Sequence, residues 1–180
     1  MNSEITSLIE SGDLLDIEDI AVHFTDPTGT LPIKGRRLQG ALKDLIYGAR
    51  EDIILISYSM STWNKGWFLW DEIGDKVADG EVTLRVFGDK RKEVERLVGR
   101  YKMYGAKGWS WVKLNEDDKS LFHLKALIVD EQIYIGSANF SGLAMEESAE
   151  WGIIAESPDL RKELLRYLNH LIKEGRMEEV

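Results

Sequence analysis

The chain alternates between segments with two hydrophobic patterns. In the first, apolar residues recur every three or four positions, which is typical of helices with one buried face. These segments cover residues 35–49, 67–78, 91–104 and 158–175. In the second, short apolar runs lack that period, as in strands covered on both faces. These runs cover residues 52–57, 82–87, 106–114, 123–129, 133–135 and 150–155. Their alternation predicts an α/β fold with a mixed β-sheet sandwiched between helices.

The first 34 residues are predicted to be an N-terminal helical extension, followed by a single domain over residues 35–180. Residues 3–20 favour one or two short helices with a break at Ser11-Gly12-Asp13. Asp26-Pro27-Thr28-Gly29 is a turn sequence before the domain. The apolar residues of residues 1–34 fit either packing on the domain or docking of a partner protein, and the sequence leaves both open.

Composition narrows the class of protein. With 180 residues, 43% hydrophobic and 31% charged, the chain fits one globular domain with a core. It has no cysteine, which excludes disulfides, thiol chemistry and cysteine-ligated zinc. The first 20 residues lack the pattern of a signal peptide, and no apolar run approaches the ~20 residues that span a bilayer. We therefore expect a cytoplasmic protein without membrane insertion.

The net charge of −9 conceals a basic segment. Residues 85–113 carry nine Lys or Arg and three Asp or Glu, a local charge of +6 on an otherwise acidic chain. Such a segment either binds an anionic partner or is a solvated helix face, and the sequence favours neither. Arg91 lies on the polar side of the predicted helix 91–104 and is a candidate substrate-binding residue.

The stretch 121–141 contains most of the residues that are suited to chemistry. His123 and Lys125 are two positions apart in a predicted strand, so their side chains project from the same face. Asp130 has the opposite parity and opens a turn, which predicts a structural role. An imidazole and an ammonium are thereby expected to point at one spot.

Small residues follow two of the predicted strands. Gly136 allows backbone to approach a ligand, and Ser137 and Asn139 supply neutral hydrogen-bonding groups. The alternative is that Ser137 and Asn139 only form a turn. The strand 52–57 is followed by Tyr58, Ser59, Ser61 and Thr62, which are candidates for lining the same pocket on their position alone.

These residue types suit a phosphodiester substrate. Lys125 and Asn139 can bind non-bridging oxygens, while His123 attacks phosphorus or protonates the leaving oxygen. A lone histidine is more often structural, but the joined pattern H-x-K-x4-D and G-S-x-N resembles the signature of the phospholipase D superfamily. The resemblance implies that Glu150 orients the histidine, and that no metal or other cofactor takes part.

The resemblance also implies an assembly. In that superfamily two such motifs face each other, one histidine forming a phosphohistidine while the other protonates the leaving oxygen. This chain has one motif, since neither His23 nor His170 has a lysine two residues later. Nucleophile and acid are needed on opposite sides of phosphorus, so we expect a homodimer with the active site at the twofold interface.

The expected function is a homodimeric nuclease acting on DNA or RNA. Compact single-motif members are similar to bacterial endonucleases, and the basic segment suits a phosphate backbone. A phospholipase or phosphatidyl transferase is the first alternative, with weak support from the aromatic residues between positions 63 and 70. A nucleic-acid-binding subunit of a defence or restriction complex is the second, and the intact His123, Lys125 and Asn139 argue against it.

Overall fold

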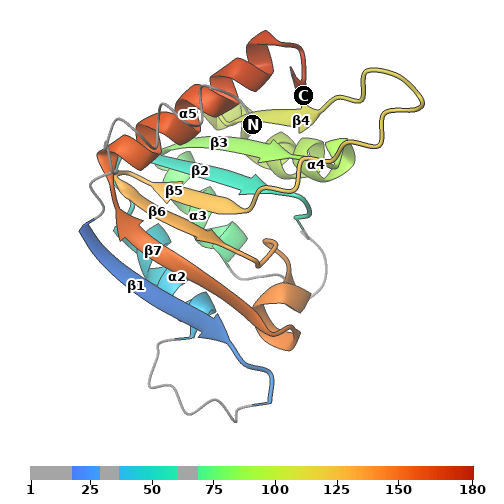
Figure 1. The fold of residues 1–180 in the computed structure, drawn as a ribbon. Helices are drawn as coiled ribbons and strands as arrows, with labels where there is room; N and C mark the ends of the chain where they lie inside the picture. The colour runs from blue at the N-terminus through green and yellow to red at the C-terminus, as the bar shows by residue number, and fades with distance from the viewer. Residues whose placement is uncertain (1–17, 29–36, 61–68) are drawn as a thin grey trace.

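An eight-stranded mixed sheet runs through the molecule (Figure 1). The computed structural model describes residues 18–28, 37–60 and 69–180. The strands are β1 (Glu18–Thr25), β2 (Asp52–Ser57), β3 (Thr83–Gly88), β4 (Lys107–Trp111), β5 (Ala126–Val129), β6 (Gln132–Gly136), β7 (Glu150–Glu156) and β8 (Met177–Glu179). They lie in the order β1-β7-β6-β5-β2-β3-β4-β8. Strands β2, β3 and β4 run parallel and the other neighbours antiparallel, which confirms the predicted mixed sheet.

Helices cover both faces of this sheet (Figure 1). One face carries α2 (Leu38–Gly48), α3 (Leu69–Ala78) and α4 (Arg91–Tyr101), and the other carries α5 (Pro158–Lys173). Two short helical segments, a 3-10 turn and a π turn, span Lys102–Tyr104 and Leu143–Glu147. No helix within the described residues is long and apolar enough to cross a membrane.

Strand β2 shows why its sequence is apolar without alternation. Ile53 and Leu55 pack in the cluster that includes residues of α2, α3 and α4, whereas Ile54 and Ile56 pack in the cluster that includes residues of α5. All four side chains are fully buried. The strand is therefore covered on both faces, as its sequence predicts.

Residues 18–25 correct the prediction of a helical extension. They form β1, which pairs antiparallel with β7, so a boundary between residues 34 and 35 does not separate them from the domain. Ile20, Val22 and Phe24 alternate with their neighbours, a period of two that favours a strand. The pairing also satisfies backbone groups of β7 that would otherwise lie at the edge of the sheet. Residues 1–17, where most of the predicted helix falls, lie outside the described residues.

Other boundaries also differ from the predictions. β5 begins at Ala126, so His123 and Lys125 precede the strand instead of lying in it. β4 spans Lys107–Trp111, inside the predicted range 106–114. The sequence analysis missed β8, which pairs with β4. A three-residue strand is too short to show a period of two.

The strand directions bring five segments to one end of the sheet, which we call the site end. Tyr58 follows β2 and Lys90 follows β3, two parallel strands that finish at the same end. β5 is antiparallel to β2, so Lys125, just before β5, lies at this end too. By the same alternation Asn139 follows the end of β6 and Glu150 begins β7.

Candidate active site

His123 and Lys125 lie side by side in the segment before β5. The Lys125 ammonium is 3.2 Å from Nδ1 and 3.3 Å from Nε2 of the imidazole, and it donates to the His123 carbonyl oxygen at 3.2 Å. Lys125 is 7% exposed, whereas His123 is exposed. Burial lowers the pKa of Lys125, and the negative charge of Glu150 opposes that shift. The site thus presents an accessible imidazole backed by a desolvated cation.

Tyr58, one of the four residues whose position after the strand 52–57 predicted that they line the pocket, packs against this pair; Ser61 and Thr62 lie outside the described residues. Its ring centroid is 4.9 Å from that of His123, with the two planes tilted by 52°. The Lys125 ammonium lies 5.9 Å from the Tyr58 centroid, and the Lys90 ammonium lies 5.1 Å from it. Tyr58 therefore contacts the imidazole and both cations of the site end.

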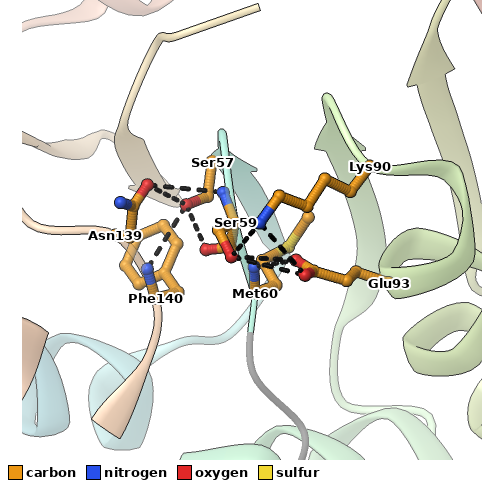
Figure 2. A network of polar contacts seen from close by, with 7 residues as sticks. All are labelled: Ser57, Ser59, Met60, Lys90, Glu93, Asn139 and Phe140. Carbon is orange, nitrogen blue, oxygen red and sulfur yellow. Dashed lines mark hydrogen bonds and ion pairs between the residues drawn. The ribbon is translucent and has the colours of Figure 1, made fainter. Parts of the chain in front are cut away.

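Asn139 is held in one orientation by the end of β2 (Figure 2). Its Oδ1 accepts a hydrogen bond from the backbone N–H of Ser59 at 3.3 Å and lies 3.3 Å from the Ser57 hydroxyl. Ser57 Oγ in turn donates to the Ser59 carbonyl at 2.8 Å and accepts from the Phe140 N–H at 3.3 Å. A backbone N–H needs an acceptor, which fixes the amide so that Nδ2 points away from this network, as Figure 2 shows. The two N–H donors of Asn139 therefore lie on the side of the amide away from Ser57 and Ser59.

Ser59 also belongs to a second set of contacts, with Glu93 and Lys90 (Figure 2). The Glu93 carboxylate accepts from the Met60 N–H at 2.6 Å and from the Ser59 hydroxyl at 3.1 Å. Lys90 donates to the Ser59 hydroxyl at 3.1 Å and lies 3.5 Å from Glu93. The predicted substrate-binding residue Ser59 is thus linked to a lysine that the sequence analysis did not select.

Arg91 is engaged elsewhere. Its guanidinium pairs with Glu95 at 2.8 Å and with Glu178 of β8 at 2.5 Å, and its hydrogen bonds to Glu95 and Glu178 raise its pKa. The structure therefore places Lys90, one residue earlier, beside Tyr58 and Ser59, and Arg91 against two carboxylates. A shift of one residue changes which side of a helix a side chain occupies.

Glu150 contacts Ser137 rather than His123. The Ser137 hydroxyl donates to the Glu150 carboxylate and accepts from the Trp151 N–H at 3.1 Å. The Ser137 N–H donates to the Trp151 carbonyl at 2.9 Å. These bonds join the turn after β6 to the start of β7, and they place a carboxylate near Lys125, whose pKa it affects.

Gly136 and Gly152 are opposite each other on β6 and β7, and the Tyr134 ring covers both. A Cβ at Gly136 would meet Tyr134 Oη at 2.3 Å, and one at Gly152 would meet Tyr134 Cε2 at 2.2 Å. Tyr134 is fully buried, and burial raises its pKa. The glycine of the G-S-x-N pattern thus leaves room for an aromatic ring beneath the turn that carries Ser137 and Asn139.

Asp130 lies at the opposite end of the sheet, in the turn between β5 and β6. Its carboxylate accepts hydrogen bonds from the backbone N–H groups of Arg50, Glu51 and Asp52 at 2.9 to 3.0 Å. Its φ of 52° is a left-handed conformation, which aspartate tolerates better than most residues. The four residues of β5 therefore separate Asp130, the third residue of the H-x-K-x4-D pattern, from His123 and Lys125.

Several side chains at the site end are of the types that bind anions. Within the described residues, no group of three or more His, Cys, Asp or Glu side chains is placed to hold a metal ion. Two ammonium groups, a carboxamide and an imidazole instead surround Tyr58 and the end of β2. Such donors bind and polarise phosphate oxygens.

A family model matches the sequence, and solved structures share the fold. Residues 42–172 match a family model described as cardiolipin synthase, PLD-like domain. The fold resembles Nuc, a phospholipase D family member from Salmonella typhimurium, with a TM-score of 0.67 and 15% identity over 90% of this chain and 97% of that one. No curated protein matches the sequence.

Two further solved structures share the fold. The archaeal chromatin protein TrmBL2, whose structure shows DNA binding, has a TM-score of 0.56 and 17% identity over 98% of this chain and 60% of that one. Phosphatidylserine synthase of Haemophilus influenzae has a TM-score of 0.62 and 14% identity over 89% of this chain and 40% of that one.

The fold and the matched family define the class as phosphodiesterase-type proteins with a phospholipase D-like domain. Because the match covers most of its length, the chain belongs to the phospholipase D superfamily, in the family described as cardiolipin synthase, PLD-like domain.

Proposed function

We propose that the chain is a homodimeric nuclease that hydrolyses phosphodiesters of DNA or RNA without a metal, through a phosphohistidine. One observation carries the proposal: the buried Lys125 ammonium lies against the accessible His123 imidazole, at the sheet end where the amide nitrogen of Asn139 points away from its contacts with Ser57 and Ser59. Together these groups can hold a phosphate and attack it.

In the proposed first step, a neutral His123 nitrogen attacks phosphorus. A P–N bond forms, the P–O bond to the leaving group breaks, and a second imidazole donates a proton to the leaving oxygen. In the second step that imidazole takes a proton from water, the water oxygen attacks phosphorus, and the P–N bond breaks. Lys125 and Asn139 stabilise the charge on the non-bridging oxygens in both steps.

The second imidazole is proposed to be His123 of a partner subunit. Attack and departure occur on opposite sides of phosphorus, and one chain offers one H-x-K-x4-D motif. A twofold axis through the site end would supply both sides with the same residues. Under this proposal a single subunit holds half of a site.

Glu150 is proposed to act on the lysine and on Ser137. Its charge favours the protonated form of Lys125, whose pKa burial lowers. Its bond to Ser137 fixes a hydroxyl next to the turn that carries Asn139. Ser137 is thus proposed to bind substrate, and Asp130 and Gly136 to support the fold.

Nucleic acid is the preferred substrate because residues 85–113 carry a local charge of +6 and because the fold resembles DNA-binding TrmBL2. The likeness to phosphatidylserine synthase, and the description of the matched family, support a lipid phosphodiester as the second candidate. A role in the cytoplasm and docking of a partner protein through residues 1–34 remain predictions.

The test is cleavage of labelled single-stranded and duplex DNA and RNA in excess EDTA, with sedimentation of the same samples. Wild type should be a dimer that cuts at least one substrate, and His123→Ala should lose at least about 10³-fold in rate. His170→Ala, which removes an exposed imidazole from α5, is the matched control and should cut normally. A folded dimer that leaves all four substrates intact would overturn the nuclease proposal, and a monomer that cuts would overturn the shared site.

A further inference from the structure

We propose that Lys90 and Tyr58 form a second phosphate subsite, which binds the phosphodiester next to the one being cleaved. The inference rests on the proposed nuclease function and defines which part of the substrate the site end holds. Its central feature is that two lysines from different parts of the chain flank one aromatic ring beside the imidazole.

The spacing of the two cations fits successive charges on one strand. The ammonium groups of Lys90 and Lys125 each lie within 6 Å of the Tyr58 centroid, so they are less than about 12 Å apart. A nucleic-acid strand carries one charge per nucleotide, about 3.4 Å apart along the axis in duplex form and farther apart when the strand is extended. A strand whose scissile phosphate lies at Lys125 therefore carries its neighbouring phosphate within reach of Lys90.

Lys90 is fixed in position but still accessible. It donates to the Ser59 hydroxyl at 3.1 Å, and its side chain is 43% exposed, against 24% for Glu93. Glu93 is 3.5 Å away and already accepts from the Met60 N–H and the Ser59 hydroxyl. These donors share the carboxylate charge, so Glu93 holds Lys90 in place without neutralising it fully.

Tyr58 ties the subsite to the reacting centre. Its ring lies 4.9 Å from that of His123, between centroids. The residue itself follows directly after β2, a fully buried strand. Ser59, the next residue, hydrogen-bonds to both Asn139 and Lys90. Occupation of the second subsite is thus coupled through one short segment to the groups at the scissile phosphate.

The subsite also discriminates between substrate classes. A glycerophospholipid such as phosphatidylserine has one phosphodiester and leaves Lys90 without an anion to bind. A polynucleotide occupies both cations at once and gains from each contact. A site with two phosphate positions therefore favours a polynucleotide strand over such a lipid.

The experiment compares two substrates in wild type, Lys90→Gln and Lys162→Gln. Bis(4-nitrophenyl) phosphate has a single phosphodiester and reports on the reacting centre, while a short oligonucleotide also occupies the second subsite. The ratio of kcat/KM for oligonucleotide over bis(4-nitrophenyl) phosphate should fall roughly tenfold in Lys90→Gln. Lys162→Gln removes the same charge from α5, on the other face of the sheet, and should leave the ratio unchanged.

A modified oligonucleotide makes the test specific. Methylphosphonate at one phosphate adjacent to the cleaved position, tested on the 5′ and the 3′ side, removes the charge that Lys90 binds. On one of the two sides, the methylphosphonate should lower oligonucleotide cleavage by wild type about tenfold, as Lys90→Gln does. In the Lys90→Gln enzyme the same methylphosphonate should lower cleavage little further, because the substitution and the modification remove the same contact. The salt dependence of oligonucleotide cleavage should also become shallower in Lys90→Gln by about one phosphate contact.

Three outcomes would overturn the subsite. A Lys90→Gln enzyme that cleaves both substrates at wild-type rates would show that the lysine binds no second phosphate, and equal losses on both substrates, which leave the ratio unchanged, would assign it to the reacting centre. If wild type hydrolyses bis(4-nitrophenyl) phosphate but no oligonucleotide, the proposed nuclease function fails, and the subsite with it.

Discussion

The two ends of the central strands β2 and β5 differ in how fully their polar side chains are paired. At the Asp130 end, by which we mean Asp130 and Asp52 with their partners, carboxylates meet backbone N–H groups and two arginines, Arg85 and Arg161. At the site end a lysine is buried beside an imidazole, and the amide nitrogen of Asn139 points away from the contacts of Ser57 and Ser59.

The comparison shows that one sequence motif serves two purposes. His123 and Lys125 belong to the site end, whereas Asp130 fixes the loop before β2 at the other end, because the four residues of β5 lie between them. Side chains at the Asp130 end should therefore contribute to stability. Side chains at the site end should contribute to catalysis and lower the stability of the fold. The predictions below separate these two contributions.

Among the variants that separate the two ends, Lys125→Met is expected to have the largest effect. The substitution keeps the length and apolar body of the side chain but removes the charge that binds phosphate, so cleavage should fall about 10² to 10³-fold. The free energy of unfolding should not fall, because methionine is buried at this position without a desolvation cost. Initial rates and urea denaturation of the same preparation check both statements. A variant that is both inactive and clearly destabilised would contradict the assignment.

Asp130→Ala should produce the opposite result. Three backbone N–H groups would lose their acceptor, which should lower the free energy of unfolding by about 3 kcal/mol. The cleavage rate per folded molecule should stay within about twofold of wild type. Asp130→Asn keeps an oxygen acceptor and tolerates the left-handed backbone, so it should be destabilised less. Loss of activity in a folded Asp130→Ala protein would place this residue in the chemistry.

Gly152→Ala tests the packing that supports the site end. Its Cβ would overlap the Tyr134 ring, at 2.2 Å from Cε2 and 2.9 Å from Cζ, and should cost about 2 kcal/mol of unfolding free energy. In a Tyr134→Leu background the ring is gone, so the cost of Gly152→Ala should fall to less than half. Thermal or urea unfolding of the four proteins measures this coupling. Equal costs in the two backgrounds would show that the ring is not the reason for the glycine.

The smallest effect concerns pH. Burial lowers the pKa of Lys125 below its ordinary 10.5, so at lower pH the folded wild type carries the cost of a desolvated charge. Between the lowered pKa and 10.5 the folded lysine is neutral while the unfolded one is charged, and stability rises with pH. The stability advantage of Lys125→Met over wild type should therefore shrink across that window. Unfolding free energies of both proteins at several pH values give the slope, and an advantage that grows with pH would contradict it.

The sequence predicted the central part of the fold better than its edges. The strand predicted at Asp52–Ser57 and the predicted helices lie close to the observed ones. Burial on one or both faces of an element determines which positions are apolar, so the sequence pattern reveals it. Strands β1 and β8 lie at the two edges of the sheet and were missed. An edge strand needs one neighbour only, and that neighbour is distant in sequence.

The candidate site was predicted within the motif and, by position, at the end of β2, whereas Lys90 at the end of β3 was missed. His123, Lys125 and Asn139 fall within a short stretch, and the structure brings them to one end of the sheet. Lys90 and Tyr58 meet them only because parallel β2 and β3 finish at the same end. The signal that pointed to Tyr58 was present for Lys90 too: each follows the carboxyl end of a buried strand, where α/β sheets commonly bind ligands.

The most direct test of the central claim, one active site built from two copies of His123, is a subunit-mixing experiment. Wild type is unfolded and refolded with increasing amounts of His123→Ala, and total nuclease activity is measured at a constant amount of wild-type chain. The account predicts that activity falls in proportion to the wild-type fraction, to about half at equal amounts, because mixed dimers carry one histidine where two are needed. When His170→Ala is mixed with wild type in the same way, total activity should rise with the amount added, because this variant is itself active. Activity that stays constant as His123→Ala is added would mean that each subunit works alone, and would contradict the shared site.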